Sequence, residues 1–246
     1  LTDITVTPVH IAFDEACESA AERGIRVTGS ELVGLIPKQS LLDAADFFLK
    51  RQQRSLGISE SEKMKIAIKS LGLDDLRPFD PKKKVIEYML EEPGAERLVS
   101  MDLKKFTEET AGESPAPGGG SVGAYVGALG AALGTMVANL SAHKRGWDDK
   151  WDQYSEWAVI GEKHRNELLY LVDEDTRAFD RILAAFGLPK GSDAEKAARA
   201  KAITEATKGA INTPLRTMEV CVESMALMQA MAETGLPASV SDAGVG

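Results

Sequence analysis

Cysteine and histidine are scarce in this chain of 246 residues, which holds two cysteines and three histidines. Cys17 and Cys221 lie far apart, in regions of different character, so the sequence contains neither a disulfide framework nor a spacing typical of a metal site. We therefore expect a reducing, cytoplasmic setting and no bound metal. Excess positive charge is lacking too, and the net charge of −9 argues against nucleic acid or an anionic membrane as the main partner.

Long apolar runs are absent with one exception, the nineteen residues 122–140, which carry no charged side chain. This segment is long enough to cross a bilayer, and its spacing of small residues is found in membrane helices. Its composition favours another interpretation, because much of it is glycine and alanine and a charged, tryptophan-rich segment follows it. We predict the buried central helix of a bundle and no membrane span, with a membrane anchor as the alternative.

A segment rich in proline and glycine, Ser114–Ser121, lies directly before this helix. Its three consecutive glycines leave the main chain open to a ligand, and Ser121 is suited to cap the helix that follows. A linker is the alternative. The segment lacks the Gly-Lys-Ser/Thr ending of a phosphate-binding loop. Glycines then recur in the helix at spacings of three and four, which predicts close packing against another helix.

The first part of the chain mixes two kinds of pattern. Alternating or short apolar runs predict strands over 1–6, 25–28 and 32–37. Apolar residues at helical spacing predict helices over 7–24, 40–51, 59–71 and 85–90. Because Leu1 is not an initiating methionine and the chain stops as an apolar segment begins, we expect a piece of a longer polypeptide.

From residue 100 onward almost every segment predicts a helix. The predicted helices, the first capped by Ser100 and the fourth by Ser192, cover 101–111, 122–141, 151–186, 193–211 and 215–232. Thr213-Pro214 is expected to break or kink the chain between the last two. The sequence thus predicts a multidomain protein, with a partial α+β unit over 1–90, a linker over 91–99 and an all-α helical bundle over 100–246.

The helix predicted over 151–186 carries a carboxylate inside its apolar stripe. The stripe is formed by Leu168, Val172, Phe179, Ile182 and Phe186, and Asp175 occupies the slot that the spacing of three and four leaves open. A carboxylate on a core face is costly unless it is paired or used, so Asp175 is a candidate general acid or base. A buried hydrogen bond to a neighbouring helix, or a stripe interrupted at the surface, are the alternatives.

Two further residues are possible supporting groups. His143 ends the glycine- and alanine-rich helix beside Lys144 and Arg145, and a cation that satisfies the helix dipole is its alternative role. Asp173 falls outside the stripe, where it can be solvated or pair with Arg177.

Taken together, several motifs closely resemble the formimidoyltetrahydrofolate cyclodeaminase family. They are Ser114–Ser121, the small-residue helix, Leu171–Phe179, Leu188–Lys190 and Ser239–Val245. Upstream motifs resemble the C-terminal end of glutamate formimidoyltransferase, namely Val6–His10, Gly29–Pro37 and Arg77–Pro81. Their order is similar to that in the bifunctional formimidoyltransferase-cyclodeaminases.

The resemblance implies a folate enzyme of histidine degradation in one-carbon metabolism. The transferase moves a formimidoyl group from N-formimidoyl-L-glutamate to tetrahydrofolate, and the cyclodeaminase closes 5-formimidoyltetrahydrofolate to 5,10-methenyltetrahydrofolate with release of ammonia. It further implies polyglutamated tetrahydrofolate as the co-substrate and a homodimer or larger homo-oligomer. The transferase's catalytic histidine would lie upstream of Leu1.

The family's catalytic aspartate falls on Asp175. We expect the folate to be held by Pro117, Gly118, Gly119, Gly120 and Ser121, and its glutamate tail to face Lys144 and Arg145. A methenyltetrahydrofolate cyclohydrolase is the nearest alternative, since it shares the helical fold and the glycine loop. A non-catalytic helical oligomerisation module is an alternative of a different class.

Overall fold

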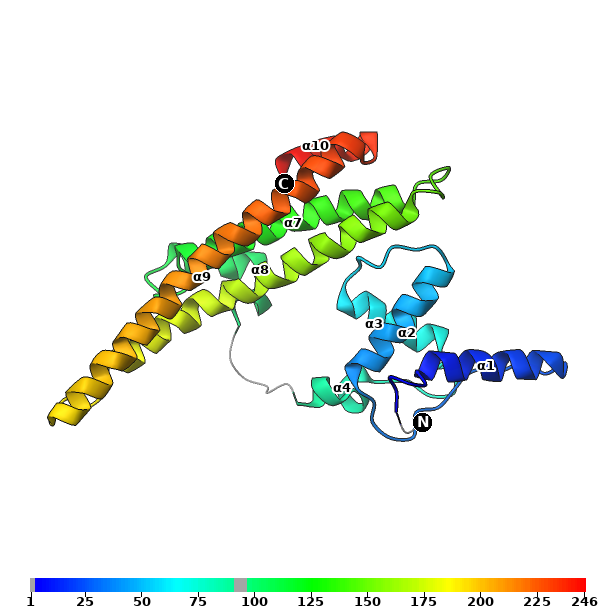
Figure 1. Cartoon of the computed structure of the whole chain (residues 1–246), viewed down its shortest axis with the longest axis horizontal. Helices are drawn as coiled ribbons and strands as arrows, with labels where there is room; N and C mark the ends of the chain where they lie inside the picture. The colour runs from blue at the N-terminus through cyan, green and yellow to red at the C-terminus, as the bar shows by residue number, and fades with distance from the viewer. Residues whose placement is uncertain (1–2, 91–96) are drawn as a thin grey trace. The chain divides into compact units, whose positions relative to one another are not determined.

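The structure, a computed structural model, describes residues 3–90 and 97–246. The first two residues of the strand predicted over 1–6 and most of the linker predicted over 91–99 lie outside the described residues. Two compact units are present. Unit 1 comprises Leu1–Gly94 and Ala142–Glu156, and unit 2 comprises Ala95–Ser141 and Trp157–Gly246. Helices provide the regular structure of both units (Figure 1).

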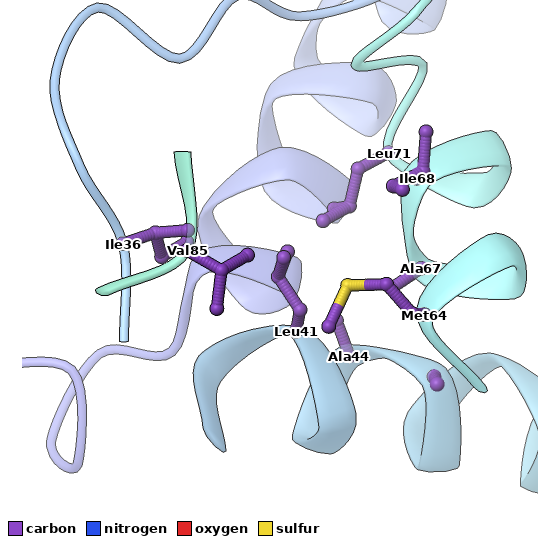
Figure 2. Close-up of a cluster of buried hydrophobic side chains, with 9 residues drawn as sticks. Ile36, Leu41, Ala44, Met64, Ala67, Ile68, Leu71 and Val85 are labelled. Atoms are coloured by element: carbon purple, nitrogen blue, oxygen red, sulfur yellow. The ribbon is translucent and has the colours of Figure 1, made fainter. Parts of the chain in front are cut away.

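Unit 1 is built on short helices whose ends follow the sequence signals. Its elements are α1 (Val9–Glu22), α2 (Lys38–Arg51), α3 (Glu60–Ser70), α4 (Pro81–Lys84) and α5 (Ile86–Met89). Ser59 caps α3, because its side chain accepts a hydrogen bond from the Glu62 N–H, as expected of a serine at this position. Leu41 and Ala44 of α2 pack with Met64 and Ala67 of α3 in an apolar core (Figure 2).

The strand predictions for unit 1 are wrong for the residues that the structure describes. The one β interaction there is an isolated parallel bridge between Ile36 and Val85, closed by the Ile86 N–H bonding to the Ile36 carbonyl at 3.0 Å. A strand needs a neighbouring strand for its backbone groups. The Ile25 N–H instead donates to the Ala20 carbonyl at the end of α1, and the Leu32 carbonyl accepts from Lys84 Nζ. The Ile25 and Val33 side chains are exposed, Val33 to 90%, so alternation alone did not suffice to form a strand.

Unit 2 is the helical bundle that the sequence predicts. Its elements are η1 (Leu98–Ser100), α6 (Leu103–Ala111), α7 (Gly119–Ala142), α8 (Trp151–Phe186), α9 (Asp193–Thr234), η2 (Pro237–Ser239) and α10 (Val240–Val245). The last residue of α7 and the first turns of α8 are grouped with unit 1. Asp102, not Ser100, caps α6, because Ser100 lies in a 3-10 turn and the Asp102 side chain accepts from the Lys105 N–H.

Small residues let α7 pack closely against its neighbours. A Cβ on Gly127 would lie 2.6 Å from the Cys221 sulfur of α9, and one on Gly134 would lie 2.7 Å from the Met228 sulfur. The predicted close packing is confirmed at these two positions but not at Gly123, where a Cβ would meet no described atom within 4 Å. Helix α7 is also long and apolar enough to cross a membrane by length and composition alone, with 44% of its most apolar window buried inside the protein.

Helix α9 continues through the predicted break at Thr213-Pro214 without interruption. A proline inside a helix removes one main-chain donor and crowds the carbonyl four residues earlier. Here the helix tolerates that loss over a length of 42 residues, with Thr213 Oγ1 donating to the Gly209 carbonyl at 3.2 Å. The predicted start is confirmed, because Ser192 and Glu195 form a capping box.

Candidate active site

Asp175 lies where the apolar stripe of α8 leaves the core. Leu168 and Val172, two turns and one turn before it, are fully buried, whereas Phe179 and Phe186 beyond it are 48% and 53% exposed. Past the start of α7, helices α8 and α9 continue as a pair (Figure 1). Two helices can bury only the faces between them, so the predicted core-facing stripe is wrong for its second half. The carboxylate itself is partly buried.

One oxygen of Asp175 is tied to the first turn of α7. Its Oδ2 accepts a hydrogen bond from the Ser121 N–H at 3.0 Å and lies 3.3 Å from Ser121 Oγ. Ser121 is fully buried and its hydroxyl donates to the Val172 carbonyl at 2.8 Å. The sequence predicted Ser121 as the cap of α7, and this prediction is wrong. Ser121 lies in the first turn of α7, and Asp175 from α8 caps that turn. No described group bonds to Oδ1, which is left for a ligand.

The glycines before α7 make room for this carboxylate. A Cβ on Gly120 would come within 2.7 Å of Asp175 Oδ2, and one on Gly118 would lie 3.6 Å from the same atom. A Cβ on Gly119 would meet no described atom within 4 Å. Pro117 is buried. Gly120 is therefore the position at which any side chain displaces Asp175.

A pocket of about 270 Å³ opens beside Asp175 within unit 2. Its walls include Ala116 and Gly118 from the glycine-rich segment, Thr176 and Phe179 from α8, and Ala210 from α9. An apolar wall with a few convergent polar groups is typical of a small-molecule site. The arrangement can place a ligand against one free carboxylate oxygen and against nearly bare main chain.

Asp173 does not share this pocket. Its Oδ1 accepts a hydrogen bond from the Leu98 N–H at 2.7 Å, which caps the 3-10 turn of unit 2. It lines a neighbouring pocket of about 380 Å³ that shares Ala116, Thr176 and Asp180 with the first one. The structure thus gives Asp173 a hydrogen-bonding role next to the candidate site.

His143, Lys144 and Arg145 lie in unit 1 and line a different pocket, of about 280 Å³, together with Arg54. His143 Nε2 accepts a hydrogen bond from the Ser55 N–H at 3.1 Å. Burial lowers the pKa of His143, and the nearby charge of Arg54 lowers it further. The ring is therefore held neutral, which counts against the alternative role of a helix-terminal cation.

Several lining residues escaped the sequence analysis, namely Thr176, Leu183 and Ala210. Leu183 lies two turns after Asp175 on the same face of α8, so the helical period contained a signal for it. Thr176 is adjacent to Asp175, but no sequence pattern marks it as a pocket residue. Ala210 lies on α9, so its place in the pocket depends on the packing of two helices. Within 3–90 and 97–246, no group of three or more His, Cys, Asp or Glu side chains is placed to hold a metal ion.

A bundle in which a glycine-rich turn and a half-free carboxylate line one pocket defines a class of helical proteins suited to proton-transfer chemistry. Residues 102–246 match the family described as formiminotransferase-cyclodeaminase, and residues 1–91 match the formiminotransferase domain. The chain belongs to the formiminotransferase-cyclodeaminase family.

The chain is also similar to individual proteins, one of which bears the name of this family. The chain is 37% identical over 243 residues to the formimidoyltransferase-cyclodeaminase of Mus musculus, covering 98% of this chain and 45% of the relative. It therefore spans less than half the length of that relative. It is 40% identical over 143 residues to the methenyltetrahydrofolate cyclohydrolase of Methylorubrum extorquens, covering 58% of this chain and 69% of that one. The crystal structure of formiminotetrahydrofolate cyclodeaminase from Thermotoga maritima is 32% identical, with a TM-score of 0.49, and 58% of this chain and 68% of that one are covered.

Proposed function

We propose that this chain carries the cyclodeaminase centre of a bifunctional folate enzyme of histidine degradation. The reaction closes 5-formimidoyltetrahydrofolate to 5,10-methenyltetrahydrofolate and releases ammonia. The observation that carries the proposal is Asp175, whose Oδ1 is unengaged in a glycine-lined pocket inside the segment that matches the family. Tetrahydrofolate is the co-substrate in this proposal, with a polyglutamate tail and no metal.

The proposed chemistry needs one group that accepts and returns a proton. N10 of the folate attacks the amidinium carbon, so that an N–C bond forms and the carbon becomes tetrahedral. Asp175 takes the proton from N10 and delivers it to the amino nitrogen, the carbon–nitrogen bond breaks, and ammonia leaves with that proton. Atoms and charge balance, because an amidinium cation becomes the methenyl cation plus neutral ammonia.

Ser121 and Gly120 position the shuttle. The Ser121 N–H holds Oδ2 at 3.0 Å, so the carboxylate presents Oδ1 in a fixed direction. The first turn of a helix also favours negative charge, which suits a base that must be ionised before it acts. The bare main chain at Gly118 and Gly119 is proposed to lie against the folate, with Pro117 fixing the turn.

The first part of the chain is proposed to be the end of a formimidoyltransferase domain. Its match over residues 1–91 supports a boundary near the linker proposed at 91–99, with the cyclodeaminase domain over 100–246. In the whole polypeptide this domain would transfer the formimidoyl group from N-formimidoyl-L-glutamate to tetrahydrofolate. An α+β character is proposed for that domain as a whole, of which this chain carries the C-terminal part.

Lys144 and Arg145 are proposed to bind the glutamate tail of the folate. They line one pocket with Arg54 and with one carboxylate, Asp148, so positive charge prevails in the lining and favours an anion in a protein of net charge −9. Unchanged binding of polyglutamated folate by a Lys144→Ala/Arg145→Ala variant would refute this role. His143, held by Ser55 in the same pocket, would then be a structural residue.

A second copy of the chain is proposed to cover the outer face of unit 2. Exposed apolar side chains recur at spacings of three and four on two helices, in the pattern of a coiled-coil seam. They are Val126, Leu129, Met136 and Leu140 on α7, and Ile211, Leu215, Met218, Val222 and Met225 on α9. Exposed apolar side chains that recur in this way are a surface that a partner can cover. Packing of α7 against α8 and α9 supports a bundle helix and no membrane span.

A methenyltetrahydrofolate cyclohydrolase is the second candidate, because the Methylorubrum relative bears that name. The deciding experiment follows the products of the whole polypeptide. Ammonia released in proportion to methenyltetrahydrofolate from the formimidoyl substrate supports the cyclodeaminase. Hydrolysis of added methenyltetrahydrofolate without any ammonia chemistry supports the cyclohydrolase, and a folate-independent dimer without either activity supports the oligomerisation module. The free cysteines Cys17 and Cys221 support a cytoplasmic location.

A further inference from the structure

Three helices of unit 1 end with the same pair of main-chain hydrogen bonds. In α1 the Ile25 N–H donates to the Ala20 carbonyl at 2.9 Å. The Gly24 N–H donates to the Ala21 carbonyl at 3.0 Å. This is the Schellman motif, in which the residue after the C-cap is left-handed and an apolar residue commonly follows it. Glycine is the usual residue at the left-handed position, because a Cβ is strained there.

Two of the three helix ends carry the residues that this motif favours. In α1, Gly24 has a φ of +68° and is followed by Ile25. In α3, Gly72 has a φ of +61° and is followed by Leu73, and both of these residues donate as their counterparts in α1 do. Leu73 also packs against the apolar core of unit 1. The residues at these two ends therefore suit the stability of the fold.

Helix α2 has the same ending with different residues. The Arg54 N–H donates to the Leu49 carbonyl at 2.9 Å, and the Gln53 N–H donates to the Lys50 carbonyl at 3.0 Å. Gln53 has a φ of +52° and is the one residue other than glycine with a positive φ in the part of the chain that the structure describes. Arg54 stands where the other two ends have an apolar residue. Both residues forgo stability at this end, and strained residues of this kind cluster at functional sites.

Both side chains line the pocket of about 280 Å³ that also holds Lys144 and Arg145. Gln53 and Arg54 are exposed, and no described group bonds to either side chain. A ligand in this pocket can therefore reach them without breaking an existing bond. Asp148 is the carboxylate among the lining residues, so the three cations leave an excess of positive charge.

A hydrogen bond holds the two segments of this pocket together. Ser55 follows Arg54 directly, and its N–H donates to His143 Nε2 at 3.1 Å. His143 in turn precedes Lys144 and Arg145 in the chain. Burial lowers the pKa of His143 and the nearby charge of Arg54 lowers it further, so the ring is neutral and accepts this bond. The cations from both segments are thus fixed around one cavity.

We propose that Gln53 and Arg54 bind the glutamate tail of the folate, and that the end of α2 is shaped for this ligand. The inference rests on the proposed function and adds two residues from the segment that matches the formiminotransferase domain. A γ-linked glutamate chain carries one carboxylate and one amide for each residue. The planar guanidinium of Arg54 fits a carboxylate with two parallel hydrogen bonds. The Gln53 amide both donates and accepts, which suits the amide of the chain.

The test uses the whole polypeptide and two ligands, tetrahydrofolate with one glutamate and tetrahydrofolate with five. Gln53→Gly removes the side chain and gives the helix end its usual residue. Arg54→Gln removes the charge and keeps a hydrogen-bonding side chain. The dissociation constants of both ligands and the melting temperature are measured on each variant, and Lys144→Ala/Arg145→Ala is measured beside them.

The same unit offers two matched controls. Gly24→Gln places a glutamine at the equivalent position of α1, where a Cβ would meet no described atom within 4 Å. It should lower the melting temperature and leave the binding of both ligands unchanged. Lys50→Gln removes a positive charge from the last turn of α2, away from the residues that line the pocket. It should bind both ligands as the wild type does.

Gln53→Gly is expected to change stability and binding in opposite directions. The melting temperature should rise by about 2–4 °C, because glycine relieves the strain of a positive φ. Binding of the pentaglutamate should weaken by about threefold or more, and in Arg54→Gln by about tenfold. The affinity for the monoglutamate should change by less than about twofold in both variants, because this ligand lacks the tail.

A purely structural role of Gln53 and Arg54 leads to another result. If their variants keep the preference for the pentaglutamate while Lys144→Ala/Arg145→Ala loses it, the inference is overturned and the proposed tail site stands. If all three variants keep the preference, the proposed tail site falls and takes the inference with it. Equal losses in Arg54→Gln and Lys50→Gln would also overturn the inference, because they would indicate a general effect of charge.

Discussion

The two sides of Asp175 along α8 differ in what covers them. Before Asp175 the helix faces a filled core, with Leu168 and Val172 fully buried beneath α7. After it the same stripe is open, and Phe179 and Leu183 form the wall of a pocket. The carboxylate stands at the boundary, with one oxygen bound to the protein and the other free. A polar residue within an apolar stripe therefore marks the place where the core ends.

The largest expected loss of activity comes from a substitution that displaces the Asp175 side chain and leaves its chemistry unchanged. Gly120→Ala places a Cβ within 2.7 Å of Asp175 Oδ2, so the carboxylate must leave its position at the α7 terminus. We expect ammonia release to fall by about 100-fold or more, since a small misplacement of a catalytic group is costly. The measurement is steady-state kinetics with folding followed by circular dichroism.

Gly123→Ala is the matched control for that variant. It lies one turn further along α7, where a Cβ would meet no described atom within 4 Å. Alanine there should stabilise the helix by about 0.5–1 kcal/mol and leave turnover unchanged. Equal losses of activity in both variants would mean that α7 is disturbed as a whole, and the role of Gly120 would be disproved.

The next prediction compares how much a residue before Asp175 and a residue after it on α8 contribute to the free energy of unfolding. Leu168→Ala should lower the free energy of unfolding by about 3 kcal/mol, because it leaves a cavity in a closed core. Phe179→Ala should cost less than about 1 kcal/mol, because that ring is 48% exposed. Urea denaturation of both variants measures the difference, and a larger loss for Phe179 would show that the pocket wall is covered in solution.

A smaller effect concerns Asp173. Its carboxylate accepts the Leu98 N–H at 2.7 Å, so Asp173→Ala should destabilise unit 2 by about 1 kcal/mol. Denaturant unfolding gives this number, and a loss of activity with unchanged stability would instead assign Asp173 to the chemistry.

The smallest effect is a pH dependence on the buried side of α8. Burial lowers the pKa of His164 below its ordinary 6.5, against an opposing pull from the Glu223 carboxylate. Its ring faces Ser224, Lys163, Glu167 and Arg216 as well. The unfolded chain therefore binds the proton more readily, so His164 contributes stability above pH 6.5 that is lost as the pH falls below it.

His164→Gln tests this sign. The difference in unfolding free energy between wild type and variant should shrink on acidification from pH 7.5 to about 5.5. A difference that grows instead would mean that His164 is stabilised as a cation by Glu223.

Sequence periodicity found Asp175 and the long helices, because an apolar stripe and a cap are local signals. It could not give the partner of Asp175, since the Ser121 contact joins residues 54 positions apart. The prediction that Ser121 caps α7 was wrong for that reason, because the Asp175 carboxylate from α8 accepts the N–H bond at the start of α7. Of the two outcomes predicted for Thr213-Pro214, a break or a kink, the break was wrong, because neighbouring turns and packing hold α9 together on both sides.

The strand predictions failed for a related physical reason. Alternation in 25–28 and 32–37 describes what a strand needs from its side chains, but a sheet also needs a partner for each backbone group. Thr176 and Ala210 were beyond prediction, because they line the pocket only through the packing of separate helices, which no local pattern reveals.

The most direct test of the account is ammonia release by the whole polypeptide with Asp175→Asn beside Glu174→Gln. Glu174 is the neighbouring carboxylate on α8 and pairs with Arg177 and Arg181. We predict that Asp175→Asn lowers kcat by about 10²–10⁴-fold with folding and folate binding retained, and that Glu174→Gln stays near wild type. Wild-type turnover in Asp175→Asn would contradict the account and reduce Asp175 to the cap of α7.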